Sequence, residues 1–205
     1  MNPAPSLRLC LDKPIPEIAV AARFLNEAVS AHLAGDYTLA EELICRSDMP
    51  AIREWMKSMW ADSRIHLRVP KARPALPLDL RSQPRMPVAS VKRRVHERDG
   101  FHCRFCGIPV IRPETRARIN ARYPKAVKWG RKESVRHPAF QAMWAQYDHL
   151  VPHSHGGTSD FENLVLTCAA CNFGRAGYTL EEVGVADPRS RPRVRSEWDG
   201  LERFL

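Results

Sequence analysis

The chain has 205 residues, a formal net charge of +9 at pH 7 and a pI near 9.6. This length has room for one medium domain or two small ones. No apolar run reaches membrane-spanning length and no signal peptide is apparent, so we expect a cytoplasmic protein without a membrane partner. The positive charge favours a polyanionic partner, although a basic solvated surface would give the same excess.

Residues 1–67 predict a small all-helical unit behind an extended tail that contains Pro3, Pro5 and Pro14. A first helix is expected to begin near Pro16, which is favoured in the first turn, and to end at Gly35. Its apolar residues recur at helical spacing: Ile18, Ala21, Ala22, Leu25, Val29 and Leu33.

Two further helices are expected in the same unit. Asp36 can cap one over 38–44, and Asp48 can cap the next, which carries Ile52, Trp55, Met56 and Met59. We expect Trp55 and Trp60 to lie in the core rather than on a binding surface. The unit carries no chemistry of its own, so it is predicted to dock a protein partner or a second copy of the chain.

Five prolines lie within 68–87. Proline neither continues a helix nor pairs inside a sheet, so this stretch is a semi-rigid linker or a strap laid on a surface. It is the clearest domain boundary in the sequence.

Helical periodicity returns over 88–99, with Val88, Val91 and Val95 on one face. Basic side chains occupy the rest of this helix, and two of them, Arg93 and Arg94, are candidate DNA contacts.

The six cysteines include two Cys-x-x-Cys pairs, Cys103 with Cys106 and Cys168 with Cys171. Two such pairs with a long gap between them predict a closed zinc site of four cysteines, of the structural kind. Cys10 and Cys45 are expected to be ordinary thiols.

Between residues 110 and 136 the chain has nine Lys or Arg side chains and two Glu. Helices are predicted over 113–122 and 138–146. A run of charge is often only a solvated face, but this one interleaves Tyr123 and Trp129. We favour a DNA-gripping role for this run, with these candidates: Arg118, Arg122, Lys125 and Lys128.

The most informative stretch begins with a short strand that ends in Asp148-His149. A loop containing Gly156-Gly157 follows, then Asn163, an apolar strand over 164–166, and the second Cys-x-x-Cys pair, which opens a helix carrying Asn172. In this order the residues resemble the ββα-metal core of the HNH endonuclease family. The resemblance covers about residues 88–180. It implies an α+β fold, a zinc site that ties the helix over 88–99 to the core, and an insertion over 110–147.

The chemistry of the residues agrees with that resemblance. Histidine is the natural base at neutral pH, so His149 is the candidate to deprotonate water. Successive side chains on a strand alternate in direction, so the strand must end or kink for Asp148 to act beside His149. Asp148 and the amide oxygen of Asn172 are hard ligands suited to Mg²⁺ or Mn²⁺.

Other roles follow from the resemblance alone. It implies that Asn163 fixes the loop and orients His149, and that Arg175 lies near the scissile phosphate. In the loop, His153 or His155 can contact phosphate or act as an accessory metal ligand, and His155 is the preferred candidate.

The remaining residues, 181–205, are predicted to form a basic tail. Thr179 begins a capping box, which predicts a short helix after it. Arginines recur at 189, 191, 193 and 195. The apolar end, with Trp198, Leu201, Phe204 and Leu205, is expected to dock on the protein or on a partner.

The sequence therefore predicts a DNA endonuclease with one structural Zn²⁺ and one catalytic Mg²⁺ or Mn²⁺, acting on double-stranded DNA and nicking it as a monomer. A role in phage defence or in a mobile element is an analogy with the family. The alternative is a zinc-stabilised nucleic-acid-binding module without catalysis.

Overall fold

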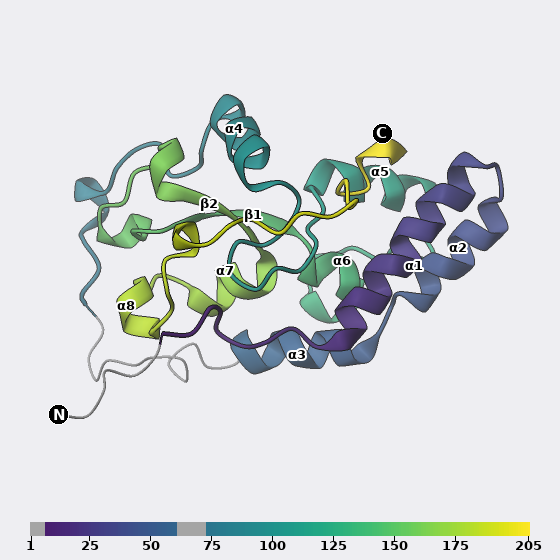
Figure 1. Ribbon diagram of the computed structural model, residues 1–205, viewed down its shortest axis with the longest axis horizontal. Coiled ribbons are helices and arrows are strands. Elements are labelled where there is room, and N and C mark those ends of the chain that lie inside the picture. The colour runs from purple at the N-terminus through teal and green to yellow at the C-terminus, as the bar shows by residue number, and fades with distance from the viewer. Residues whose placement is uncertain (1–6, 61–72) are drawn as a thin grey trace.

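The computed structural model describes residues 7–60 and 73–205 (Figure 1). The predictions for Pro3, Pro5 and residues 61–72 concern positions outside these ranges. At one end of the molecule, α1 (Pro16–Leu33) and α2 (Tyr37–Arg46) form an antiparallel pair. Pro16 begins α1 as predicted. Gly35 adopts a φ of 85° between the helices, a conformation that costs glycine little.

The local signals at these helix ends are largely confirmed. The Asp36 side chain accepts a hydrogen bond from the Leu39 amide and caps α2. Leu33 differs from the expected pattern, since it is 59% exposed at the last turn of α1. Within the described chain Asp48 does not cap α3 (Pro50–Trp60), which begins instead at a proline suited to the first turn.

The third helix joins the N-terminal helices to the rest of the molecule. Ile52, Trp55, Met56 and Met59 are buried, and α3 packs against both α6 (Pro138–Ala142) and α7 (Ala169–Arg175). The helices α3 and α7 approach closely at Gly174, where an added Cβ would lie 3.2 Å from the Met59 Cβ. One hydrophobic core therefore extends from α1 through α3 to the strands.

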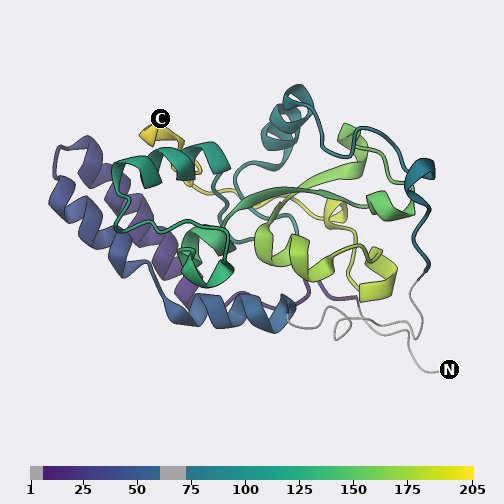
Figure 2. The same cartoon turned by 180° about the vertical axis from the view of Figure 1, so that it is seen from behind.

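The centre of the molecule is a two-stranded antiparallel sheet of β1 (Ala145–His149) and β2 (Leu164–Cys168), with Asp148 opposite Val165. The strand end at His149 and the helix after the second cysteine pair agree with the sequence prediction. The helix predicted over 138–146 is wrong in its second half: α6 ends at Ala142. The backbone from Ala145 instead pairs with β2, and tertiary pairing overrides local helical preference. Figure 2 shows α7 beside the two strands.

A buried carboxylate connects α4 (Ala89–Asp99) to β2. Asp99 is 2% exposed, accepts a hydrogen bond from the Leu166 amide and forms an ion pair with Arg98. Val95 is buried, but Val88 is 56% exposed at the start of the helix. The expected apolar face is therefore shorter than the sequence pattern indicated.

The described part of the proline-rich stretch, residues 73–87, is a strap that lies against the loop after β1. Its only helical turn is η2 (Leu78–Leu80). The Leu76 amide donates to the Ser154 carbonyl over 2.8 Å, and the Ser82 hydroxyl donates to the Gly157 carbonyl over 2.7 Å. Of the two possibilities that the composition left open, the described residues fit the strap.

The basic segment and the C-terminus pack onto the same body. The helix α5 (Pro113–Arg122) has its predicted bounds. The guanidinium of Arg116 stacks 3.6 Å from the centre of the Trp129 ring. Past α8 (Leu180–Val183), which has the predicted capping box, the tail docks on the protein: Trp198 donates to the Val110 carbonyl and Leu201 is fully buried.

The remaining helical segments are single turns: η3 (Glu133–Val135), η4 (His153–His155), η5 (Phe161–Asn163), η6 (Pro188–Ser190) and η7 (Glu202–Phe204). No helix among residues 7–60 and 73–205 is long and apolar enough to cross a bilayer.

Candidate active site and metal centre

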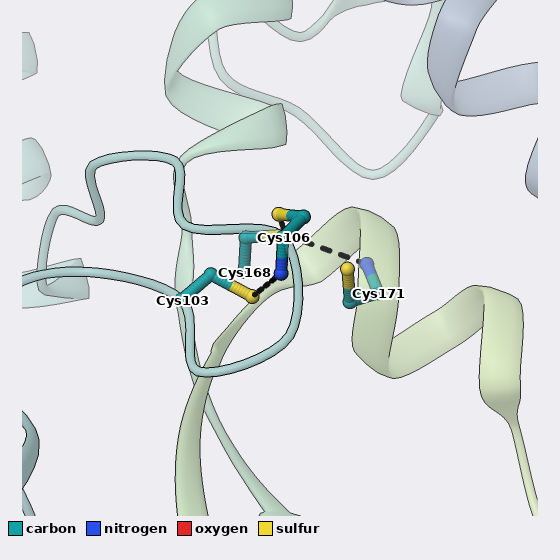
Figure 3. Close-up of side chains that lie close together, drawn as sticks. All are labelled: Cys103, Cys106, Cys168 and Cys171. Atoms are coloured by element: carbon teal, nitrogen blue, oxygen red, sulfur yellow. Dashed lines mark hydrogen bonds between the residues drawn. The ribbon is translucent and has the colours of Figure 1, made fainter. Parts of the chain in front are cut away.

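Four cysteine thiols converge where the segment after α4 meets the start of α7 (Figure 3). Cys103 and Cys106 come from the turn after α4, Cys168 ends β2, and Cys171 lies in the first turn of α7. Their sulfur atoms all lie within 4.8 Å of one another, and the Cys106 and Cys168 sulfurs are 3.6 Å apart. Zn–S bonds of about 2.3 Å in a tetrahedron require sulfur separations of just under 4 Å, so the cluster fits one zinc ion.

The backbone of each pair supports this geometry. The Cys106 amide points at the Cys103 sulfur over 3.5 Å, and the Cys171 amide points at the Cys168 sulfur over 3.4 Å. Amide donors of this kind stabilise a thiolate, the form that binds metal. Cys10 and Cys45 are outside the cluster.

A second site lies at the other end of the strand pair. Asp148, His149 and Asn172 all line one cavity of about 600 Å³. Asp148 and His149 are adjacent at the end of β1, and both residues line the cavity. Asn172 comes from α7, which packs against β1. Three of the four predicted catalytic residues are therefore brought together.

A short hydrogen-bond chain fixes the imidazole of His149. Its Nε2 lies 3.0 Å from the Ser159 hydroxyl, and that hydroxyl donates its proton to the Arg85 carbonyl over 2.7 Å. A serine hydroxyl has one proton, so towards His149 it can only accept. Nε2 must therefore carry hydrogen. Nδ1 is left as the basic nitrogen, with no hydrogen-bond partner in the described chain.

The surroundings of His149 keep it uncharged near pH 7. Burial lowers the pKa of His149 to about 4, and electrostatic interactions with His153, Arg175 and Arg85 act in the same direction. The imidazole is therefore protonated only as the pH falls towards 4, and at neutral pH it is in the form that can accept a proton.

Asn163 closes the loop between the strands. Its amide oxygen accepts from the Val151 amide over 2.9 Å, and its amide nitrogen donates to the carbonyls of Val151 and Thr158. Gly157 lies directly inside this turn: an added Cβ would be 1.8 Å from the Val151 oxygen. The Asn163 side chain makes no hydrogen bond to His149, and the imidazole is bound instead by Ser159.

Arg175 and Asp148 form a buried pair under β1. Arg175 is 2% exposed, binds both carboxylate oxygens of Asp148, and also donates to the carbonyls of Tyr178 and His149. Burial raises the pKa of Asp148, while the charge of Arg175 and its hydrogen bonds act against this rise. A phosphate contact from Arg175 would require these bonds to break.

The donor set still fits a hard divalent cation. A carboxylate oxygen that accepts one hydrogen bond keeps a second lone pair, so Asp148 can bind a cation beside Arg175. The Asn172 side chain makes no hydrogen bond within the described chain, and its amide oxygen is free to coordinate. Mg²⁺ is usually bound by one or two protein oxygens, and water and phosphate fill its remaining coordination positions.

The other DNA-binding candidates lie outside this cavity. Arg93 and Arg94 are exposed on α4, and Arg94 stacks on Phe161. Four candidates are exposed on α5 and on the segment after it: Arg118, Arg122, Lys125 and Lys128. This region lies beside α1 and α2, where Arg122 stacks on Tyr37, and Figure 1 shows α5 at the end of the molecule opposite α8. His155 is half-buried and contacts the Arg73 carbonyl.

The cavity has basic residues that the sequence did not single out. Arg81 and Arg85 reach it from the strap and Lys92 from α4. Ser159, the partner of His149, was also missed. In the sequence, Arg81 and Arg85 are marked only by their charge within a proline-rich stretch. Composition does not predict against which part of the protein such a stretch packs.

The hydrogen-bond chain leads to a prediction for Ser159→Ala. The kcat of cleavage should fall on the order of 10- to 100-fold, the usual loss when the partner that orients a functional histidine is removed. The KM should change little. The ¹⁵N chemical shifts of the imidazole should move towards the Nδ1–H tautomer, and Ser159→Thr, which keeps the hydroxyl, should restore both readouts. Unchanged tautomer and kcat would show that Ser159 does not position His149.

Residues 133–174 match the family model described as HNH endonuclease, a segment shorter than half of the chain. It contains Asp148, His149, Asn163 and Asn172, so the resemblance read from the sequence is confirmed over this segment. No curated protein and no solved structure matches the chain.

Proposed function

We propose that this protein is a metal-dependent DNA endonuclease of the HNH type that hydrolyses phosphodiester bonds in the cytoplasm. The observation that carries the proposal is the convergence of Asp148, His149 and Asn172 on one cavity, within the segment that matches the family. A neutral imidazole with a free nitrogen and two oxygen ligands for a hard cation are the parts that such hydrolysis needs.

His149 acts as the general base. The Ser159 hydroxyl and the Arg85 carbonyl hold hydrogen on Nε2, so Nδ1 accepts the proton of the attacking water. Asp148 and Asn172 would hold Mg²⁺ or Mn²⁺. When bound, the ion would stabilise charge on the phosphoryl oxygens and on the leaving 3′ oxygen. Asn163 holds the loop that carries Ser159, and so acts on His149 indirectly.

One observation favours a different function. Both carboxylate oxygens of Asp148 are engaged by Arg175, which is the arrangement expected if Asp148 no longer binds a catalytic ion. The second candidate is thus a zinc-stabilised nucleic-acid-binding module without catalysis. Incubation of supercoiled plasmid with Mg²⁺, with Mn²⁺ or with EDTA separates the two. Cleavage that requires the divalent ion supports the nuclease, and DNA binding without cleavage under every condition supports the module.

The form of the product is a further expectation. His149 is the proposed base of the one cavity, and the two strands of a duplex have opposite polarity, so one binding event should break one strand. Open-circular plasmid should therefore appear first, and linear DNA late, through independent nicks. A time course at several protein concentrations, with the mass in solution, tests this. Linear product that forms together with open circles at low protein concentration would indicate a dimer with paired sites.

A partner-docking or self-association role for α1 to α3 remains a proposal that rests on their lack of catalytic residues. A role in phage defence or in a mobile element rests on the range of functions within the family.

A further inference from the structure

The proline-rich strap forms one wall of the cavity that contains His149. Arg81, Arg85 and Met86 line the cavity from the strap, and Lys92 faces them from α4. Residues about 70 positions apart in the sequence thus meet around one space, and the basic ones lie beside Asp148, His149 and Asn172.

Several hydrogen bonds fix the strap in this position. His153 contacts the Ser82 carbonyl over 2.7 Å, and the Ser159 hydroxyl donates to the Arg85 carbonyl. Together with the Leu76 and Ser82 bonds to the same loop, they connect the strap to both ends of the segment 153–159. The strap and the orientation of His149 are therefore parts of one hydrogen-bonded structure.

The charge of this cavity is unbalanced. Among the described residues that line it, Asp148 is the only carboxylate, and it is paired with the buried Arg175. Arg81, Arg85 and Lys92 form no ion pair with any described residue. Arg81 uses its Nε to bind the Leu76 carbonyl, and the Arg85 side chain makes no hydrogen bond in the described chain. Lys92 lies over the Tyr147 ring, 5.6 Å from its centre, so the positive charges of Arg81 and Arg85 are the least engaged by the protein.

These observations contrast with those for the basic segment after residue 110. Several of its arginines have protein partners: Arg112 pairs with Glu202, Arg116 stacks on Trp129, and Arg136 donates to the carbonyls of Gly130 and Arg131. None of its basic residues lines the cavity. These three of the nine basic side chains of this segment are thus engaged within the fold.

We propose that Arg81 and Arg85 of the strap, together with Lys92, bind the DNA phosphates that flank the scissile bond. The inference rests on the proposed function for its location, since it assigns the substrate contacts of that same cavity. The strap then has two roles in one site: its side chains hold the DNA backbone, and its Arg85 carbonyl ends the hydrogen-bond chain from His149.

The test is the salt dependence of DNA binding, measured in EDTA so that no cleavage occurs. For Arg85→Gln, and for the Arg81→Gln/Arg85→Gln variant, affinity should fall for every duplex sequence. The slope of log K against log salt should decrease by about 0.9 for each phosphate that the variant no longer neutralises. Arg85→Lys should restore most of the slope, because a single positive charge is retained.

A matched control removes the same charge elsewhere. Arg23 on α1 and Lys57 on α3 are both exposed, and the Arg23→Gln/Lys57→Gln variant should leave the slope close to wild type. An Arg118→Gln/Arg122→Gln/Lys125→Gln variant compares the α5 region directly, and a smaller effect there than in the strap is expected. Arg85 is the informative single change, since its exposed side chain holds no part of the fold and Arg85→Gln should melt as wild type does.

The outcomes separate this inference from the proposed function. An unchanged salt slope in both strap variants would overturn the strap as the phosphate-binding element, whether or not the protein cleaves DNA. A reduced slope in a protein that never cleaves would retain the strap contacts and remove the nuclease assignment instead.

Discussion

Replacement of His149 with alanine is expected to lower the rate of DNA cleavage by about two to four orders of magnitude, the usual cost of losing a general base. The reason lies in its local structure: the imidazole is held by Ser159, is neutral at pH 7 and has a free Nδ1. It lines an open cavity, so its removal should leave no destabilised core. The measurement is the initial rate of plasmid nicking with saturating Mg²⁺ at pH 7.

Binding and folding provide the controls for this variant. DNA affinity in EDTA and the melting temperature of His149→Ala should stay near wild type. Since burial lowers the pKa of this histidine to about 4, the wild-type rate should not depend on its protonation between pH 6 and 8. Full cleavage by His149→Ala at neutral pH would remove His149 from the mechanism.

The second large effect is expected at the zinc cluster. Cys171→Ser should strongly destabilise the protein, because zinc binding by four thiolates contributes folding free energy, roughly 10–16 kcal/mol in isolated zinc-finger peptides. Only part of that amount should appear here, since the cluster is attached to a large hydrophobic core. Elemental analysis should find about one zinc per wild-type chain and much less in the variant, and thermal unfolding should begin at a lower temperature.

Cys45→Ser is the matched control, because Cys45 is an exposed thiol on α2 outside the cluster. This variant should keep its zinc and its melting temperature. A wild-type protein that contains no zinc after purification, and that melts cooperatively at the same temperature with or without chelator, would contradict a structural zinc site.

Much of the local structure could be predicted because its causes are local. Pro16 begins α1, Asp36 caps α2 and Thr179 opens a capping box, and each acts within about four residues of itself. The strand that ends at His149 was predicted from its place in the motif. The first two residues of the strand, 145 and 146, were predicted as helix, because only pairing with β2, about twenty residues later, makes them extended.

The candidate site was predictable only in part, for the same physical reason. Asp148, His149 and Asn172 lie in a compact motif, so their convergence follows from a short stretch of chain. Ser159 meets the Arg85 carbonyl across 74 residues, and no periodicity or spacing reports such a contact. The pairing of Arg175 with Asp148 was missed because position in the motif says nothing about burial.

The distribution of the four clustered cysteines limits how the HNH-matching segment can be exchanged between proteins. The segment that matches the family, 133–174, contains Cys168 and Cys171 but neither Cys103 nor Cys106. It also excludes Arg85 of the strap and the helices α1 and α3, whose apolar faces cover α6 and α7. A recombination event that transferred only this segment would carry the catalytic signature without half of the metal ligands and without its hydrophobic cover. The proposed site and the cysteine cluster therefore depend on more of the chain than the segment that matches the family model.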